Sequence, residues 1–189
     1  MKEIKIAFIG VDGTGKSTIA NILKNKLDEK IEIQHMGANK SAETKFRKYI
    51  VQKKKDNVFF KILSGVSLYY DRWYRVIKNE RKKGVIIYDR HPLYNPTDAR
   101  KFKRILDKVI YSLMPMPHLI YYFYCDVNTS IQRKPSEFES EYSIIELKRK
   151  KKIFDYKYLK NKNIKKINTD QLGEQQIIQM ITNDLKNNG

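Results

Sequence analysis

The most constraining feature of the sequence is a glycine-rich segment, GVDGTGKST, at residues 10–18. It matches the pattern G-x-x-x-x-G-K-[ST] of a phosphate-binding loop and directly follows an apolar run at residues 4–9. The next segment, 17–27, carries apolar residues at helical spacing. A strand, a glycine-rich turn and a helix in this order predict a loop whose backbone N–H groups surround a phosphate chain at the positive end of the helix.

The pattern along the rest of the chain predicts the fold class. Runs typical of buried strands lie at Ile4–Ile9, Ile31–Gln34, Val85–Tyr88, Leu119–Cys125 and Ile164–Ile167. Helical patterns cover residues 17–27, 58–77, 97–113, 140–160 and 173–187. Because no repeat or linker interrupts the 189 residues, we expect one domain over residues 1–189. Its expected fold is α/β, with three layers and a mainly parallel sheet flanked by helices.

Composition bounds the class of protein. The net charge is +18, and runs such as Lys53–Lys55 and Lys148–Lys152 are typical of solvated helix surfaces that attract polyanionic nucleotides. A dedicated nucleic-acid face stays an alternative, although the sequence carries no zinc-finger or RNA-binding signature. No apolar stretch approaches the length of a membrane span and the first residues lack a signal-peptide pattern, so we expect a cytoplasmic protein without a membrane partner.

The cysteine and the histidines indicate no metal centre. Cys125 is the single cysteine and ends an apolar run, which predicts a buried core thiol. His35, His91 and His118 lack the spacing of metal ligands, so we do not expect a structural zinc.

The residue types of the glycine-rich segment predict how it would bind the phosphates of a nucleotide. The expected phosphate-binding residues are Gly10, Gly13, Thr14, Gly15, Lys16, Ser17 and Thr18. Lys16 should reach the β- and γ-phosphates as a point charge, and the Ser17 hydroxyl should complete the coordination of Mg²⁺.

A second motif separates the classes of protein that share such a loop. A GTPase would need N-K-x-D, but residues 39–42 lack the Asp, and the D-x-x-G match at residues 170–173 comes too late in the chain. A motor or DNA-processing ATPase usually has two acids at the end of a later strand, whereas here Asp89 is followed by Arg90. Asp89 should orient metal-bound water or the acceptor, and Arg90 offers a planar fork for a second phosphate.

Three stretches carry a resemblance to a known family. They are FIGVDGTGKST at 8–18, VIIYDR at 85–90 and CDVNTSIQRK at 125–134, and in this order and spacing they resemble the thymidylate kinase group of P-loop kinases. The resemblance spans most of the chain. It implies a five-stranded parallel sheet, ATP and Mg²⁺ as cofactors, and a nucleoside monophosphate as acceptor, with dTMP converted to dTDP in nucleotide biosynthesis.

The resemblance also implies roles for residues around the loop. Asp12 would approach the acceptor sugar, Arg90 would hold the acceptor phosphate, and Arg133 would open a short lid, about 133–142, over the ATP phosphates. Some members have an arginine directly after the loop acid. This chain has Gly13 there, so the catalytic cations are expected from the lid, namely Arg133 and Lys134, with Arg149 a weaker candidate. Members are commonly dimers, which implies a possible homodimer.

The acceptor site departs from the family pattern. Arg72 matches the arginine that reads the thymine, but the position four residues earlier is Leu68, with Tyr69 next to it. Tyr69 is expected either to stack on the base or to belong to the core, and His91 replaces the aromatic residue that usually follows Asp-Arg. Three interpretations remain open: a dTMP kinase, a kinase of the same fold for a deoxynucleoside or phosphorylated metabolite, and a nucleic-acid-associated P-loop ATPase.

Overall fold

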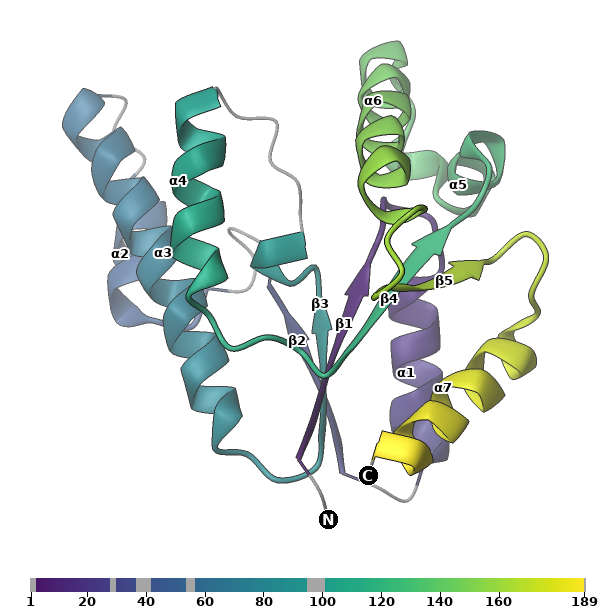
Figure 1. The fold of residues 1–189 in the computed structure, drawn as a ribbon. Helices are drawn as coiled ribbons and strands as arrows, with labels where there is room; N and C mark the ends of the chain where they lie inside the picture. The colour runs from purple at the N-terminus through teal and green to yellow at the C-terminus, as the bar shows by residue number, and fades with distance from the viewer. Residues whose placement is uncertain (1–2, 28–29, 37–41, 54–56, 95–100, 189) are drawn as a thin grey trace.

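The computed structural model describes residues 3–27, 30–36, 42–53, 57–94 and 101–188, with the side chains of 101–104 outside this description. Five strands form one parallel sheet in the order β2-β3-β1-β4-β5 (Figure 1). They are β1 (Ile4–Ile9), β2 (Ile31–His35), β3 (Val85–Asp89), β4 (Leu119–Tyr124) and β5 (Lys165–Asn168). The α/β fold is confirmed, and each predicted strand is found with its boundaries shifted by no more than one residue.

The helices cover both faces of the sheet. They are α1 (Lys16–Lys26), α2 (Lys45–Lys53), α3 (Val58–Glu80), α4 (Lys101–Ser112), α5 (Val127–Arg133), α6 (Glu141–Tyr158) and α7 (Glu174–Asn188), with short 3₁₀ helices η1 (Pro92–Tyr94) and η2 (Pro135–Glu137). Sequence periodicity missed α2 and α5, because nine and seven residues are too few to establish a helical period. Residues 97–100 of the helix expected at 97–113 lie outside the described residues.

Strand side chains alternate between two cores. Ile4, Ile6 and Phe8 of β1 face α1 and α7, which contribute apolar residues such as Leu23 and Ile181 to the same cluster. The opposite face of the sheet packs against α6 through one cluster and against α3 and α4 through another. All six residues of β1 are buried, as expected for a central strand of a parallel sheet. Cys125 at the end of β4 is a buried free thiol, as the sequence predicts.

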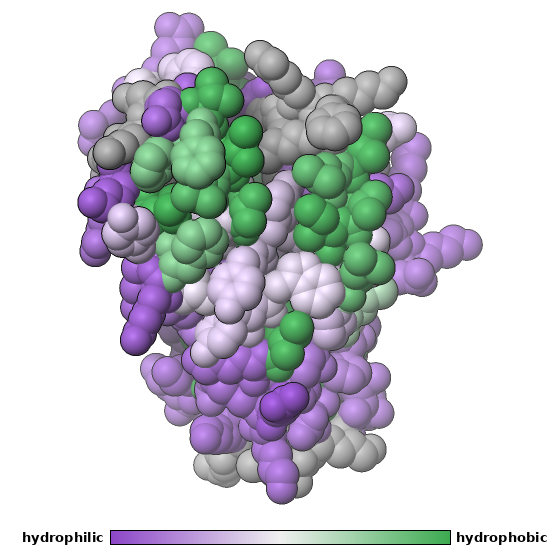
Figure 2. Space-filling view, turned by 90° about the vertical axis from the view of Figure 1, so that its left-hand side faces the viewer, coloured by the Kyte–Doolittle hydropathy of each residue, from purple (hydrophilic) through white to green (hydrophobic). Residues whose placement is uncertain are grey.

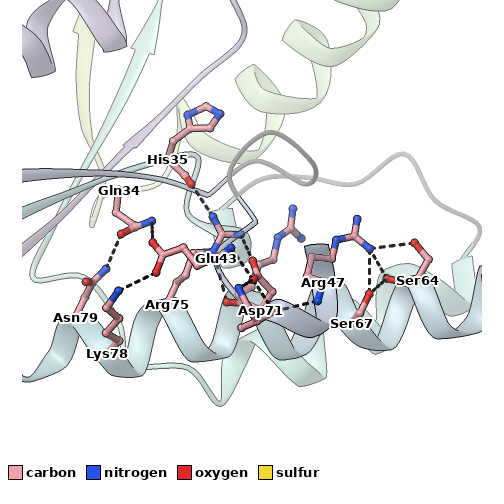
Figure 3. Close-up of polar contacts among 12 residues, drawn as sticks. Gln34, His35, Glu43, Arg47, Ser64, Ser67, Asp71, Arg75, Lys78 and Asn79 are labelled. Atoms are coloured by element: carbon pink, nitrogen blue, oxygen red, sulfur yellow. Dashed lines mark hydrogen bonds and ion pairs between the residues drawn. The ribbon is translucent and has the colours of Figure 1, made fainter. Parts of the chain in front are cut away.

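A buried polar network joins α3 to the carboxyl end of β2 (Figure 3). Asp71 and Arg75 are both fully buried and form an ion pair of 2.8 Å. Arg75 Nη1 also donates to the backbone carbonyl of His35 at 2.7 Å. Asp71 Oδ1 accepts from the backbone N–H of Glu43 at 3.0 Å and of Thr44 at 2.7 Å. Because a buried charge left unpaired costs several kcal/mol, on the order of 3–5, this network holds the end of β2 against α3.

One face of the molecule exposes many apolar side chains. Figure 2 shows them on the side where α3 and α4 lie in Figure 1. On α3 the exposed apolar residues are Val58, Phe59, Ile62, Val66, Tyr70, Tyr74 and Ile77. A groove of about 470 Å³ on the same helix is lined by Tyr70, Trp73, Tyr74, Ile77, Lys78 and Arg81. No helix in the described parts of the chain combines the length and apolarity needed to cross a bilayer.

Candidate active site

The loop between β1 and α1 is packed against its neighbours at backbone level. Gly10, Gly13 and Gly15 adopt φ values of 140°, 81° and 81°. A Cβ added to Gly10 would lie 2.2 Å from the carbonyl oxygen of Phe123 in β4, and one added to Gly13 would lie 2.6 Å from that of Ser130 in α5. Glycine is therefore required at both positions by space and by backbone conformation.

Lys16 places a buried cation inside this loop. Its side chain is held by the backbone carbonyl of Val11 and by Thr14 Oγ1, the latter at 2.9 Å. Burial lowers the pKa of Lys16 to about 8, although the negative charges of Asp89 and Asp12 act in the opposite direction. A charge so poorly hydrated interacts strongly with an anion that enters the loop.

A cavity of about 950 Å³ opens at the carboxyl end of the sheet. Five parts of the chain line it: the glycine-rich loop with the start of α1, the end of β2, the end of β3, the end of α5 with the segment after it, and the loop from β5 into α7. The lining residues are Asp12 to Ile19, His35, Asp89, Arg90, Arg133, Lys134, Glu137, Thr169 to Glu174 and Ile177. A volume of this size accommodates a nucleotide, and its position matches the expected ligand site of an open parallel sheet.

Asp89 is an ionised carboxylate in this cavity. Its Oδ2 accepts a hydrogen bond from His35 Nδ1 at 2.8 Å and lies 3.4 Å from Ser17 Oγ. Burial alone would raise the pKa of Asp89, but the His35 hydrogen bond and the charge of Lys16 outweigh it and hold the pKa below its usual range. Oδ1 is buried and has no hydrogen-bond partner within the described ranges. An ionised carboxylate with a spare oxygen beside a hydroxyl fits Mg²⁺, which prefers oxygen ligands.

Arg90 and Asp12 meet at the edge of the same cavity. The guanidinium of Arg90 forms an ion pair with the Asp12 carboxylate, and the Arg90 backbone N–H donates to the Phe8 carbonyl at 3.1 Å. Arg90 is a non-glycine residue with a φ of 66°. Such left-handed backbone costs on the order of 1–3 kcal/mol and is concentrated at functional sites.

Two of the three cations expected from the lid reach the cavity. Arg133, the last residue of α5, donates through Nη1 to Thr169 Oγ1 at 2.8 Å and through Nη2 to the Thr169 carbonyl at 2.9 Å. Lys134 follows it and pairs with Glu137 at 2.6 Å. Arg149 instead pairs with Glu146 on the exposed side of α6, away from the cavity lining.

Arg72 and Tyr69 belong to a separate cluster between α3 and α4. Arg72 is buried, donates to the Tyr111 hydroxyl at 2.6 Å, and has an Nε without a hydrogen-bond partner among the residues described. The Tyr69 hydroxyl donates to Asp107, and its ring lies 5.5 Å from that of Tyr111. Arg72 is therefore not the ion-pair partner of its neighbour Asp71, since that carboxylate pairs with Arg75.

His91 is fully buried beside Arg72. Its ring lies 5.2 Å from the ring of Tyr88 and 5.8 Å from that of Tyr94. Burial, together with the charge of Arg72, lowers the pKa of His91 to about 4, so the imidazole is neutral near pH 7. His91 thus fills an aromatic position, as the residue that it replaces in the family pattern would.

Sequence reasoning missed two parts of the site. The spacing of His35 predicts no metal site, yet its side chain contacts Asp89. Residues 170–173 match a GTPase motif only in pattern, yet with Thr169 they line the cavity. His35 ends a strand of the parallel sheet, and residues 170–173 closely follow one. Because ligands bind at the carboxyl ends of such strands, this position in the sequence indicates a site.

The sequence profile of the thymidylate kinase family matches residues 8–181. The chain belongs to the thymidylate kinase family. It is accordingly an enzyme of the nucleoside monophosphate kinase class. No curated protein sequence matches the chain.

Solved structures share the fold at low identity. Thymidylate kinase from Candida albicans is 18% identical with a TM-score of 0.64, and the match covers 99% of this chain and 92% of that chain. Deoxyadenosine kinase from M. mycoides is 19% identical with a TM-score of 0.60, covering 97% and 100%. Shikimate kinase from Acinetobacter baumannii is 16% identical with a TM-score of 0.56, covering 98% and 94%. These likenesses show the three-layer P-loop kinase fold.

The close packing at Gly13 generates a test. We expect Gly13→Ala to weaken binding of a non-hydrolysable ATP analogue about tenfold or more, since strain of roughly 1–3 kcal/mol must be relieved by moving the loop. Gly65→Ala in α3 is the matched control, because a Cβ there meets no atom within 4 Å. It should leave binding unchanged and raise the free energy of unfolding by about 0.5–1 kcal/mol. Isothermal titration that gives both variants the affinity of the unchanged protein would contradict the packing argument.

Proposed function

We propose that the enzyme transfers the γ-phosphoryl group of ATP to dTMP, giving dTDP. The observation that carries the proposal is the convergence, in one cavity, of the phosphate-binding loop with the buried Lys16, the ionised Asp89 and the anchored Arg133. Phosphoryl transfer requires mainly positioning and positive charge around the transferring group. These side chains would supply both.

ATP would lie across the loop at the start of α1. Backbone N–H groups of residues 13–18 would bind its phosphates, with Lys16 at the β- and γ-phosphates and Arg133 beside the loop carbonyl of Gly13. Ser17 and Asp89, directly or through water, would hold Mg²⁺, which would supply positive charge to the phosphates. The loop from Thr169 to Gly173 lines the same cavity and would lie against the nucleoside part of ATP.

The segment after α5 would close the site. Lys134 and Glu137 both line the cavity and are about half exposed, and η2 between them begins with Pro135. Exchange of the Glu137 carboxylate for a phosphate would bring the Lys134 ammonium to the transferring group. Closure of this short lid would also exclude water, which otherwise competes with the acceptor for the phosphoryl group.

The dTMP acceptor would occupy the opposite side of the cavity. Arg90 would bind its phosphate as a planar fork, and Asp12 would contact the sugar hydroxyl. Its thymine would extend beyond the cavity lining to the cluster between α3 and α4, where Arg72 would donate to a base carbonyl and Tyr69 would lie against the ring. The unpartnered Nε of buried Arg72 supports this role, because a buried donor without a partner costs free energy that an acceptor atom can recover.

A deoxynucleoside is the alternative acceptor. The ion pair between Arg90 and Asp12 favours it, since this guanidinium already has a carboxylate partner within the protein. A deoxynucleoside has no phosphate for Arg90 to bind, so the ion pair with Asp12 could remain. The hydroxyl of the deoxynucleoside would then receive the phosphoryl group.

A panel of acceptors with labelled ATP decides between the two. We expect dTMP to have the highest kcat/KM among nucleoside monophosphates, nucleosides and sugar phosphates. Arg72→Ala should lower kcat/KM for dTMP about 10–100-fold, the value of a lost hydrogen bond to a charged group, and narrow its advantage over dCMP and dGMP. Arg149→Ala is the control. It removes an exposed cation that pairs with Glu146, and it should not change kcat/KM for dTMP. If a deoxynucleoside has a higher kcat/KM than dTMP, the proposed dTMP acceptor is wrong and the deoxynucleoside replaces it.

We also infer that the enzyme is a homodimer that associates through α3. One argument is that α3 exposes many apolar residues on the face shown in Figure 2. The other is that the family resemblance implies a dimer. Exposed apolar residues gathered on one face of a folded protein mark an interaction surface.

Sedimentation equilibrium tests the dimer. Ile62→Glu on α3 should produce a monomer, because a carboxylate would be desolvated at the interface. Ile145→Glu, at an apolar residue of similar exposure on α6, should leave the mass unchanged. A monomeric unchanged protein at micromolar concentration would refute the inference.

A further inference from the structure

We propose that His35 is a positioning residue, whose imidazole holds the Asp89 carboxylate in the orientation that phosphoryl transfer requires. Arg75 in turn holds the backbone of His35. The proposal rests on the proposed function and adds to it a residue that neither the loop motif nor the Asp-Arg motif contains.

The parallel sheet brings the two side chains together. The register of β2 and β3 pairs His35 with Asp89 at the carboxyl ends of the strands. The backbone N–H of Met36 donates to the Asp89 carbonyl at 2.9 Å, which continues the pairing one residue further. The side chains meet at the cavity, where His35 Nδ1 lies 2.8 Å from Asp89 Oδ2. Because the carboxylate can only accept, Nδ1 is the donor in this contact.

Within the described residues, His35 makes the one short hydrogen bond to the carboxylate of Asp89. Ser17 Oγ lies further away, at 3.4 Å from the same oxygen, and Oδ1 has no partner within that set. The other charges acting on the carboxylate are those of Lys16 and Arg90. Without His35, the carboxylate would be free to turn toward these cations. It would then neutralise the two groups that the proposed reaction needs at the phosphates.

The backbone of His35 is itself fixed by a buried contact. Its carbonyl accepts from Arg75 Nη1 at 2.7 Å, and Arg75 is locked by its buried ion pair with Asp71. Figure 3 shows the His35 carbonyl directed at the guanidinium of Arg75, while the ring extends to the other side of the strand. The backbone anchor and the side-chain contact are thus separate, so substitution of the imidazole leaves the anchor in place.

A purely structural role for the imidazole predicts a different outcome. The His35 side chain is 45% exposed, so its removal takes little apolar surface from the core. The Asp89 carboxylate itself is buried, but the charges of Lys16 and Arg90 would still act on it without the imidazole. Loss of His35 should therefore change the reaction while the fold keeps its stability.

The test compares His35→Ala with His35→Asn, whose side-chain amide offers an N–H near the position of Nδ1. His35→Ala should lower kcat about 10–100-fold, as removal of a group that orients a functional side chain does, with KM for ATP within about twofold. His35→Asn should recover most of the loss. His118→Ala is the matched control: its ring accepts from the Lys5 backbone N–H at the opposite end of the sheet, so its kcat should be unchanged. Thermal unfolding of the His35 variants should match that of the unchanged protein.

A second readout does not depend on turnover. Mg²⁺ should strengthen ADP binding by the unchanged protein, and His35→Ala should reduce this strengthening about 10–100-fold while ADP affinity in EDTA stays the same. If the unchanged protein phosphorylates no acceptor, the proposed function fails and the ADP titrations still decide the role of His35. A His35→Ala variant with kcat and Mg²⁺ effect within twofold of the unchanged protein would overturn the proposal. So would a His35→Asn variant no better than His35→Ala.

Discussion

The close approach of the phosphate-binding loop to β4 and α5 is the contact on which the site depends. At Gly10 the loop meets the backbone of Phe123, and at Gly13 it meets the backbone of Ser130, at separations that exclude a Cβ. An arginine directly after the loop acid, as some family members carry, would collide with α5. The absence of a side chain at Gly13 and the position of Arg133 beside the loop are consequently two results of one packing arrangement.

The same packing arranges the charges. With α5 against the loop, its last residue Arg133 reaches both the Gly13 carbonyl and Thr169 after β5, so one side chain ties together three segments around the cavity. On the other side of β1, β3 carries Asp89 and Arg90 to the loop, where they interact with Lys16 and Asp12. Cations and carboxylates lie together around the cavity, and under the proposed function a bound phosphate would replace Glu137 at Lys134 while Asp89 stays in place.

The sequence predicted the parts of this arrangement that are local. The phosphate-binding loop and the Asp-Arg pair are contiguous motifs, and the strands are short apolar runs, so both could be identified without tertiary information. The contacts of Asp89 with His35, of Arg133 with Thr169 and of Arg72 with Tyr111 join residues 54, 36 and 39 positions apart. Strand register brings the first pair together, and the packing of helices on the sheet brings the other two together; one sequence contains no direct signal for either.

The central claim is that the buried charge of Lys16 serves phosphoryl transfer, and its removal tests this most directly. The measurement is transfer of labelled γ-phosphate from ATP to acceptor by Lys16→Ala, with circular dichroism to verify the fold. The account predicts a folded protein whose kcat is about 10²–10³-fold lower, the usual loss when one electrostatic group at the transferring centre is removed. A folded Lys16→Ala protein with near-normal turnover would contradict it.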